Sequence, residues 1–148
     1  MRTVKDILES KAPVQNWIEP NATVFEALNK LNAVDLSYLV VKEGEAFKGI
    51  FSEREYSRNL ILKGRSSKET AVSDVMTTEL PTVKPTNSLD DCIHLLLQAK
   101  TRYLLAFNNG AFAGVITIHD LMRQVIANKE TSFDHSAARQ LIDHDEIY

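Results

Sequence analysis

The sequence predicts an α/β protein made of two tandem β-α-β-β-α repeats that pack through their sheets about a pseudo-twofold axis. Residues 14–58 align without a gap with the segment that begins 65 positions later. The short lead-ins VKDIL and VSDVM, at 4–8 and 72–76, repeat as well. An internal repeat decides the architecture. Because a half of about 60 residues buries too little apolar surface to be stable alone, the two sheets are expected to share a core.

Each copy is expected to begin with a short extended segment followed by an amphipathic helix. The extended segments, residues 14–18 and 80–84, each run up to a proline. Apolar residues then recur at i, i+3, i+4 and i+7 from Val24 and again from Leu89. This spacing places them on one face of a helix, so each copy is predicted to pack that face on its sheet.

A β-hairpin and a final helix complete each copy. The hairpin strands are predicted at 38–41 with 47–51 and at 103–107 with 112–116, and the pair Asn109-Gly110 is a strong turn signal because both residues tolerate positive φ. The final helices carry more apolar residues than one buried face needs, which predicts a two-fold homodimer. These residues are Tyr56, Leu60, Ile61 and Leu62 in the first copy and Leu121, Met122, Val125 and Ile126 in the second.

The repeat also predicts the domain boundaries. Residues 1–62 form the first repeat, 63–71 a polar linker, 72–128 the second repeat and 129–148 a C-terminal tail. The tail is rich in acidic residues, so it is expected to be solvated rather than to bind a metal ion.

Composition narrows the classes of function. The net charge of −3 leaves no broad basic surface for nucleic acid, and the longest apolar runs are far shorter than a membrane span. The N-terminus lacks the apolar core of a secretory signal, and a single cysteine, Cys92, excludes an internal disulfide framework. We therefore expect a cytoplasmic protein that binds neither nucleic acid nor membrane.

The corners where a hairpin strand enters the final helix share the pattern G-h-h-[ST]-x-x-[DE], at 49–55 and at 114–120. The [ST]-x-x-[DE] spacing alone favours a helix capping box, in which hydroxyl and carboxylate accept from each other's backbone N–H. The same spacing occurs at 23–26 and 88–91, where no ligand is expected. A helix N-terminus also suits ligand oxygens, so the capping and ligand roles are compatible.

The doubled corners and the doubled lead-ins resemble a tandem pair of CBS (cystathionine β-synthase) domains, a Bateman module. The run at 52–67 resembles the bacterial type in which the pair stands alone. The resemblance implies an adenosyl ligand in the clefts between the halves: AMP first, with ADP, ATP or NAD as alternatives. It implies regulation of an unidentified partner protein rather than catalysis, and no catalytic cofactor.

The resemblance also implies roles for particular residues. Thr117 and Asp120 would hold a ribose, with phosphate contacts from Thr101, Arg102 and His119, and an adenine pocket around Asn16, Asp35 and Leu36. The planar guanidinium of Arg102 suits a phosphate.

A mirror site would use the first corner, with members Ser52, Arg54, Glu55, Thr82, Lys100 and Thr101. Glu55 departs from the usual aspartate, and its extra methylene moves the carboxylate by over ~1 Å. The Thr117/Asp120 corner therefore ranks first.

Three classes of function remain open. The first is a ligand-sensing regulatory module, the second a structural or protein-interaction dimer whose corners are only caps. An enzyme ranks last, because the sequence has no phosphate-cradling loop and no metal-ligand spacing on a defined element.

Overall fold

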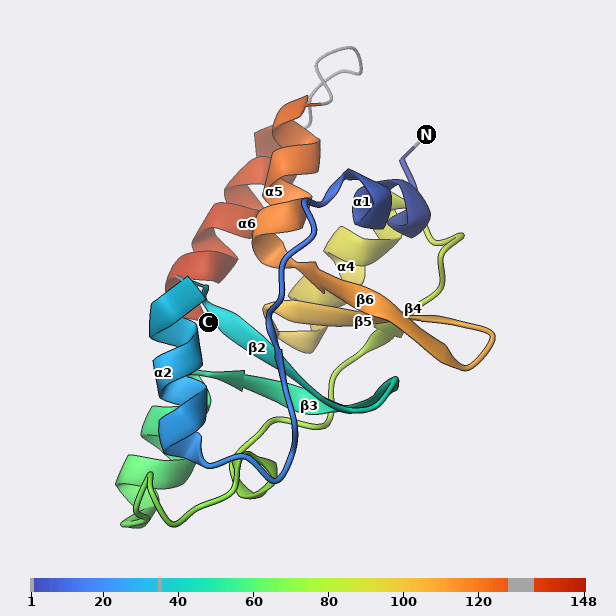
Figure 1. Ribbon diagram of the computed structural model, residues 1–148. Coiled ribbons are helices and arrows are strands. Elements are labelled where there is room, and N and C mark those ends of the chain that lie inside the picture. Colours follow the sequence, from blue (N-terminus) through green and yellow to red (C-terminus); the bar gives the residue numbers. More distant parts are fainter. Residues whose placement is uncertain (1, 35, 128–134) are drawn as a thin grey trace. The chain divides into compact units, whose positions relative to one another are not determined.

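Strands and helices recur in the predicted order in both halves of the chain (Figure 1). The computed structural model describes residues 2–34, 36–127 and 135–148. Its contacts divide the chain into two compact units. The first-repeat unit is Pro13–Glu79, and the second-repeat unit combines everything before Pro13 with Leu80–Tyr148.

The first-repeat unit holds one three-stranded sheet in the order β1-β2-β3, with β1 parallel to β2 and β2 antiparallel to β3. Its core includes Val24, Leu31, Leu39 and Phe51, which come from both the helix and the strands. The elements are β1 (Trp17–Ile18), α2 (Val24–Val34), β2 (Tyr38–Glu43), β3 (Ala46–Ser52), α3 (Glu53–Glu55), the π-helical η1 (Tyr56–Leu60) and the 3₁₀ turns η2 (Ile61–Lys63) and η3 (Val72–Asp74).

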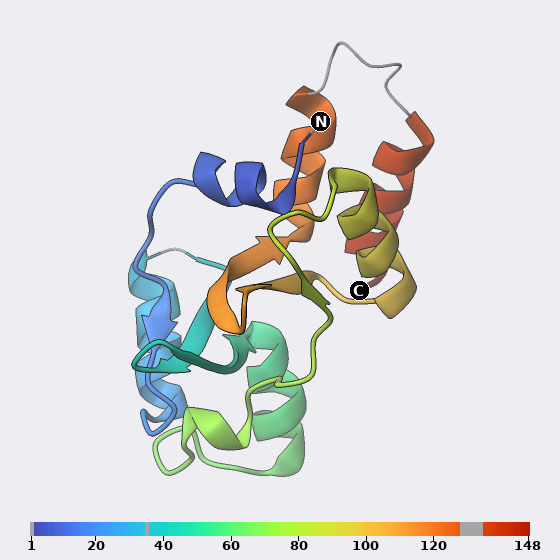
Figure 2. The ribbon, with the colours of Figure 1, turned by 90° about the vertical axis from the view of Figure 1, so that its right-hand side faces the viewer.

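The second-repeat unit repeats this sheet as β4-β5-β6 with the same strand directions. Its core draws on the sheet and on four helices. Figure 2 shows the ribbon of these helices beside the sheet. The elements are α1 (Val4–Ser10), β4 (Thr82–Val83), α4 (Leu89–Ala99), β5 (Tyr103–Asn108), β6 (Ala111–Thr117), α5 (Ile118–Ala127) and α6 (His135–Ile147).

The predicted β-α-β-β-α order is confirmed in both units. Even the irregularities repeat, since β2 carries a register shift after Val41 and β5 carries one after Ala106, 65 positions later. Asn109 and Gly110 have φ of 50° and 85°, as the predicted tight turn requires.

The lead-in segments explain the glycine that opens each corner. A Cβ on Gly114 would lie 2.8 Å from Leu8 Cδ2, and a Cβ on Gly49 would lie 2.7 Å from Met76 Sδ. The lead-in at 4–8 therefore packs on the sheet of the second repeat, while the lead-in at 72–76 packs on the sheet of the first. The compact units thus differ from the sequence repeats, because residues up to Ala12 belong with the second repeat.

The segment 63–71, which the sequence predicts as a linker, lies against the start of α2. Val24 N–H donates to the Thr70 carbonyl and Phe25 N–H donates to the Ser67 carbonyl, each at 2.9 Å. These bonds satisfy two of the free donors of the first helical turn, so the segment helps to cap α2.

The final helices of the two repeats differ in regularity. In the first repeat the segment after the corner is three α-helical residues, then a π turn and a 3₁₀ turn. In the second repeat α5 continues for ten residues. The apolar spacing of the two segments is similar, and it does not distinguish a continuous helix from a broken one.

The expectation of a solvated acidic tail is wrong for residues 135–147, which form α6. This helix contacts α4 and α5 (Figure 1). Its Leu141 is fully buried in the core of the unit. Part of the apolar excess on α5 is therefore covered by the same chain. Ile126 remains exposed.

Candidate functional site

The second corner is a complete capping box at the start of α5. Thr117 N–H donates to Asp120 Oδ2 at 2.9 Å, and Asp120 N–H donates to Thr117 Oγ1 at 3.1 Å. The carboxylate is only 3% exposed. A buried charge needs partners, and the capping bond alone leaves most of the acceptor capacity of this carboxylate unused.

Two cations supply the remaining partners of Asp120. Lys11 Nζ lies 2.8 Å from Oδ2, and Arg123 Nη2 lies 2.5 Å from Oδ1. Lys11 also donates to the Val115 carbonyl at 2.8 Å, which fixes its ammonium at the end of β6. The side chain of Arg123 is 67% exposed, so Arg123 lies between the buried carboxylate and the solvent.

A second charged cluster lies beside the same helix start. The backbone of Arg102 accepts the N–H of Ile118, the first residue of α5, at 3.0 Å. Arg102 Nη1 lies 2.6 Å from Asp145 Oδ1, and Arg102 Nη2 lies 3.4 Å from His119 Nε2. His119 Nε2 is also 3.8 Å from the same Asp145 oxygen. Arg102 and His119 thus converge on one carboxylate, which comes from α6.

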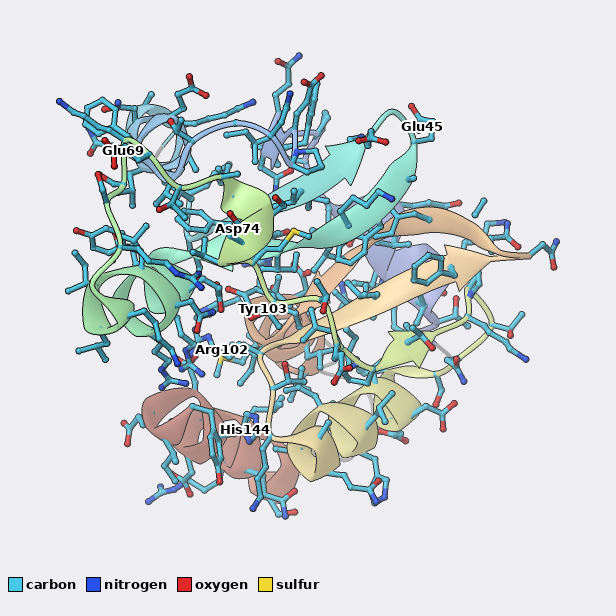
Figure 3. The ribbon with its side chains drawn as sticks, turned by 90° about the horizontal axis from the view of Figure 1, so that it is seen from below. Glu45, Glu69, Asp74, Arg102, Tyr103 and His144 are labelled. Carbon is cyan, nitrogen blue, oxygen red and sulfur yellow. The ribbon has the colours of Figure 1, made fainter. Side chains whose placement is uncertain are left out.

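The C-terminal end of α6 is held against the start of β5. Buried His144 approaches the Thr101 carbonyl, with Nε2 at 2.8 Å, and Arg102 Nη1 donates to the Asp145 carbonyl at 3.2 Å. Figure 3 labels Arg102 and His144 at this meeting point. The Thr101 side chain accepts from Tyr103 N–H at 3.4 Å.

The first corner has the same spacing but different bonds. Glu55, 6% exposed, accepts from its own Ser52 hydroxyl at 2.5 Å, and Ser52 Oγ accepts from Arg54 N–H at 3.2 Å. The other Glu55 oxygen accepts from the Thr77 hydroxyl at 3.1 Å. The predicted reciprocal capping box is therefore not formed here, because the Glu55 carboxylate accepts from the hydroxyls of Ser52 and Thr77 instead of from the Ser52 N–H.

The residues predicted for the two sites are divided between the two units. Thr101, Arg102, Thr117, His119 and Asp120 are together at the start of α5 in the second-repeat unit. The remaining predicted residues are distributed as follows: Asn16, Leu36, Ser52, Arg54 and Glu55 lie in the first-repeat unit, Thr82 and Lys100 lie in the second-repeat unit, and Asp35 lies outside the described residues.

Several predicted residues have backbone roles. The Asn16 carbonyl accepts from Val40 N–H at 2.7 Å, which joins β1 to β2. Lys100 ends α4 in the left-handed conformation, with φ of 54°. Thr82 is exposed on β4. Among the contacts given above, none joins these three residues to the cluster of Arg102, His119 and Asp145.

Four residues of the second corner were not predicted as site residues: Lys11, Arg123, His144 and Asp145. Arg123 had a signal, since it repeats Arg58 at the offset of 65. Leu141, His144 and Tyr148 had a weaker one, a spacing of i, i+3 and i+7 that indicates a helix face. Nothing local marked Lys11, which follows a lead-in that packs on the distant repeat.

The remaining candidate groups fit structural roles. The capping boxes predicted at Thr23/Glu26 and Ser88/Asp91 are both formed. Burial raises the pKa of Cys92 to about 11, so its thiol stays protonated at neutral pH and is a poor nucleophile. Within residues 2–34, 36–127 and 135–148, no group of three His, Cys, Asp or Glu side chains is arranged to hold a metal ion.

None of the helices in the described part of the chain has the length and apolar character needed to cross a membrane.

Comparison with known proteins identifies the repeat. The family model for the CBS domain matches residues 4–61 and 72–127. The mitochondrial CBS domain-containing protein CBSX3 of Arabidopsis thaliana is 33% identical over 133 residues, which cover 84% of this chain and 65% of that protein. The chain thus spans just under two thirds of that relative. The CBS domain-containing protein YhcV of Bacillus subtilis is 28% identical over 129 residues, covering 87% of this chain and 89% of YhcV.

Solved structures agree with this assignment. A protein with CBS domains from Burkholderia ambifaria is 32% identical, with a TM-score of 0.76 and coverage of 89% of this chain and 99% of the other. CBSX2, solved in complex with AMP, is 26% identical, with a TM-score of 0.68 and coverage of 88% of this chain and 100% of the other.

Proposed function

The chain belongs to the CBS-domain family and carries two CBS domains in tandem, and on that premise we propose that it is a regulatory module that binds an adenosine nucleotide at the Thr117/Asp120 corner. In this proposal the bound nucleotide changes how the module acts on a partner protein, and the module itself catalyses no reaction. The partner is an unidentified regulated protein.

The observation that carries the proposal is the buried carboxylate of Asp120 at the start of a ten-residue helix, with cations gathered around it. A ribose offers two hydroxyl donors, and an ionised carboxylate accepts such donors more strongly than a neutral group does. Lys11 pairs with one oxygen of the carboxylate, and Arg123 occupies the exposed side where the sugar would enter.

The phosphate is assigned to Arg102, His119 and Thr101. Arg102 and His119 already converge on an oxyanion, the carboxylate of Asp145, so the geometry for holding a negative oxygen is built into the start of β5. The positive end of the α5 dipole adds to the attraction.

AMP is the first ligand to test, with ADP, ATP and NAD as alternatives. The AMP complex of CBSX2 supports this choice, since that protein is similar to the chain over most of its length. The adenine pocket around Asn16, Asp35 and Leu36 and the mirror site of Ser52, Arg54, Glu55, Thr82, Lys100 and Thr101 remain predictions. We rank the mirror site second because Glu55 has neutral hydroxyl partners and because its corner begins only a three-residue α-helix.

Titration calorimetry of the wild type and of Asp120→Asn with AMP tests the proposal. The variant keeps the size of the side chain but loses the charge, so we expect at least about a tenfold loss of affinity, the equivalent of ~1.4 kcal/mol. Asp91→Asn is the matched control, because Asp91 occupies the same place in the capping box of α4. Circular dichroism establishes that each variant is folded. Equal AMP affinity in all three proteins would exclude Asp120 from the ligand site.

Assembly is a further part of the proposal. Leu62 is 77% exposed and Ile126 is 64% exposed at the ends of the two final helices, and burial against a second chain would remove this apolar surface from water. We propose a homodimer in the cytoplasm, with no contact to nucleic acid or membrane. Light scattering at micromolar concentration should give the mass of two chains, and the mass of one chain would contradict it.

A further inference from the structure

The C-terminal helix α6 places a carboxylate on the residues to which the proposed function assigns the ligand phosphate. Asp145 Oδ1 lies 2.6 Å from Arg102 Nη1 and 3.8 Å from His119 Nε2. A phosphate oxygen would use the same two side chains. The carboxylate and the phosphate therefore compete for one position.

The rest of α6 fixes this carboxylate in place. Leu141 is fully buried among core residues of the second-repeat unit, and His144 Nε2 contacts the Thr101 carbonyl at 2.8 Å. Arg102 also donates to the Asp145 carbonyl at 3.2 Å. Arg102 thus contacts both the side chain and the backbone of Asp145, on a helix that is packed against the rest of the unit.

Asp145 is unfavourable for the helix that carries it. It lies in the last turn of α6, where the negative end of the helix dipole repels a carboxylate. Asp143 and Glu146, two more acids, lie in the same turn. Asp145 Oδ1 is also buried without an aligned hydrogen bond from any described residue, so its short approach to Arg102 is an ion pair of poor geometry. A phosphate, with more acceptor oxygens, would satisfy Arg102 better than this carboxylate does.

We propose that Asp145 is a built-in competitor of the ligand phosphate, and that a nucleotide binds by displacing the C-terminal turn of α6 from Arg102. This inference rests on the proposed function and gives it a mechanism of regulation. The position of the C-terminal turn of α6 then depends on whether a nucleotide is bound. Because coupling between two binding events is reciprocal, a partner protein that holds α6 away from Arg102 raises the affinity for nucleotide.

The test compares Asp145→Asn with the matched control Asp143→Asn, in the full chain, by titration calorimetry with AMP and with adenosine. Asp143 lies on the same helix and pairs only with exposed Arg139, at 3.5 Å, among the ion pairs of the described residues. If the seated state of α6 leaves about a tenth of the molecules competent to bind, removing the competitor tightens AMP binding about tenfold. Adenosine has no phosphate, so its affinity should not change, and Asp143→Asn should leave both affinities unchanged.

A second background isolates the residue for which the two anions compete. Arg102→Gln should weaken AMP binding, and adding Asp145→Asn to it should give no gain, because no guanidinium remains to be contested. If the wild type binds AMP and Asp145→Asn binds it no tighter, or if adenosine gains as much as AMP, the competition is refuted while the proposed function stands. If neither protein binds AMP or the other adenosine nucleotides, the proposed function fails and this inference fails with it.

Discussion

The two corners share one sequence pattern but hold their carboxylates by different means. Asp120 is bonded to the Thr117 N–H and to two cations, Lys11 and Arg123. Glu55 is bonded to two hydroxyls, those of Ser52 and Thr77. Both carboxylates are almost fully buried. The carboxylate of Asp120 is thus compensated by charged partners, whereas the hydroxyl partners of Glu55 are neutral.

This difference matters for both stability and binding. A buried carboxylate that depends on a cation is destabilised strongly when the cation is removed, whereas loss of a hydroxyl donor costs a single hydrogen bond. The charged corner also begins a ten-residue helix, while the other begins three α-helical residues and a π turn. Equivalence in the sequence therefore does not make the two corners equivalent in structure.

The largest expected effect comes from removing the ammonium of the charged corner. Lys11→Met should lower the free energy of unfolding by about 3 kcal/mol, at the low end for breaking a buried pair, because Arg123 still contacts Asp120. Thr77→Val makes the corresponding change at the neutral corner and should cost about 1–2 kcal/mol. Denaturant unfolding of both variants measures the comparison directly.

An exposed lysine nearby provides the control for Lys11. Lys5 is on α1 and pairs with Glu9 across 4.0 Å with both side chains exposed, so Lys5→Met should change stability by less than about 0.5 kcal/mol. The double variant with Lys11→Met and Asp120→Asn should lose less than the sum of the single losses, since each partner is costly mainly without the other. A Lys11→Met variant as stable as Lys5→Met would mean that Arg123 and Thr117 alone hold Asp120.

The extent of prediction from sequence follows the range of the interactions. Capping boxes such as Ser88/Asp91 and the turn at Asn109-Gly110 depend on residues within four positions of each other, and they were predicted correctly. Lys11 and the end of β6 are separated by 104 positions, and Arg102 and Asp145 by 43. No local pattern carries such a pairing, so these partners required the fold.

The tail shows the same limit in another form. Its acidic composition favours solvent exposure, and the prediction of a solvated tail rests on that composition. Burial of Leu141 against α4 and α5 decides the outcome, because the apolar surface available to α6 comes from helices that are distant in sequence. The break in the helix after Glu55 is not predicted either, because the apolar spacing of these residues is similar to that of the continuous helix α5.

The glycines that open the two corners test the feature that both corners share, the close approach of a lead-in segment. A Cβ on Gly49 would lie 2.9 Å from the Thr77 carbonyl oxygen, which is backbone and cannot rotate away. Gly49→Ala should therefore destabilise the protein by about 2–3 kcal/mol through overpacking. Gly114→Ala should also destabilise it, because a Cβ there would meet Leu8 and the φ of 155° strains any side chain.

Gly44→Ala separates crowding from backbone strain. Gly44 has φ of 61° but no atom within 4 Å of an added Cβ. The Gly44→Ala variant should therefore lose about 1 kcal/mol of unfolding free energy, from the left-handed backbone alone. Thermal unfolding of the three alanine variants ranks them. If Gly49→Ala is no less stable than Gly44→Ala, the lead-in at 72–76 moves aside at little cost, and the glycine is not required by packing.

The smallest expected effect comes from an exposed capping box, which shows what the same spacing contributes without burial. The Ser88 backbone N–H, followed by the side chains of Asn87 and Ser88, holds the pKa of Asp91 below its ordinary value of 3.8. A lowered carboxyl pKa in the folded state adds stability above the unfolded pKa, and this stability is lost as the pH falls through the folded value. Asp91→Asn should therefore be slightly less stable than the wild type at pH 7, and the gap in melting temperature should close below about pH 3.8.

Ser88→Ala distinguishes the two kinds of donor in this box. The substitution removes the hydroxyl but keeps the backbone N–H, which is the main cause of the lowered pKa of Asp91. Most of the pH dependence should remain in Ser88→Ala and be absent in Asp91→Asn when both are melted in parallel with the wild type between pH 7 and pH 3. If the difference in melting temperature between Asp91→Asn and the wild type stays constant over this range, the cap acts through helix geometry rather than through the charge of the carboxylate.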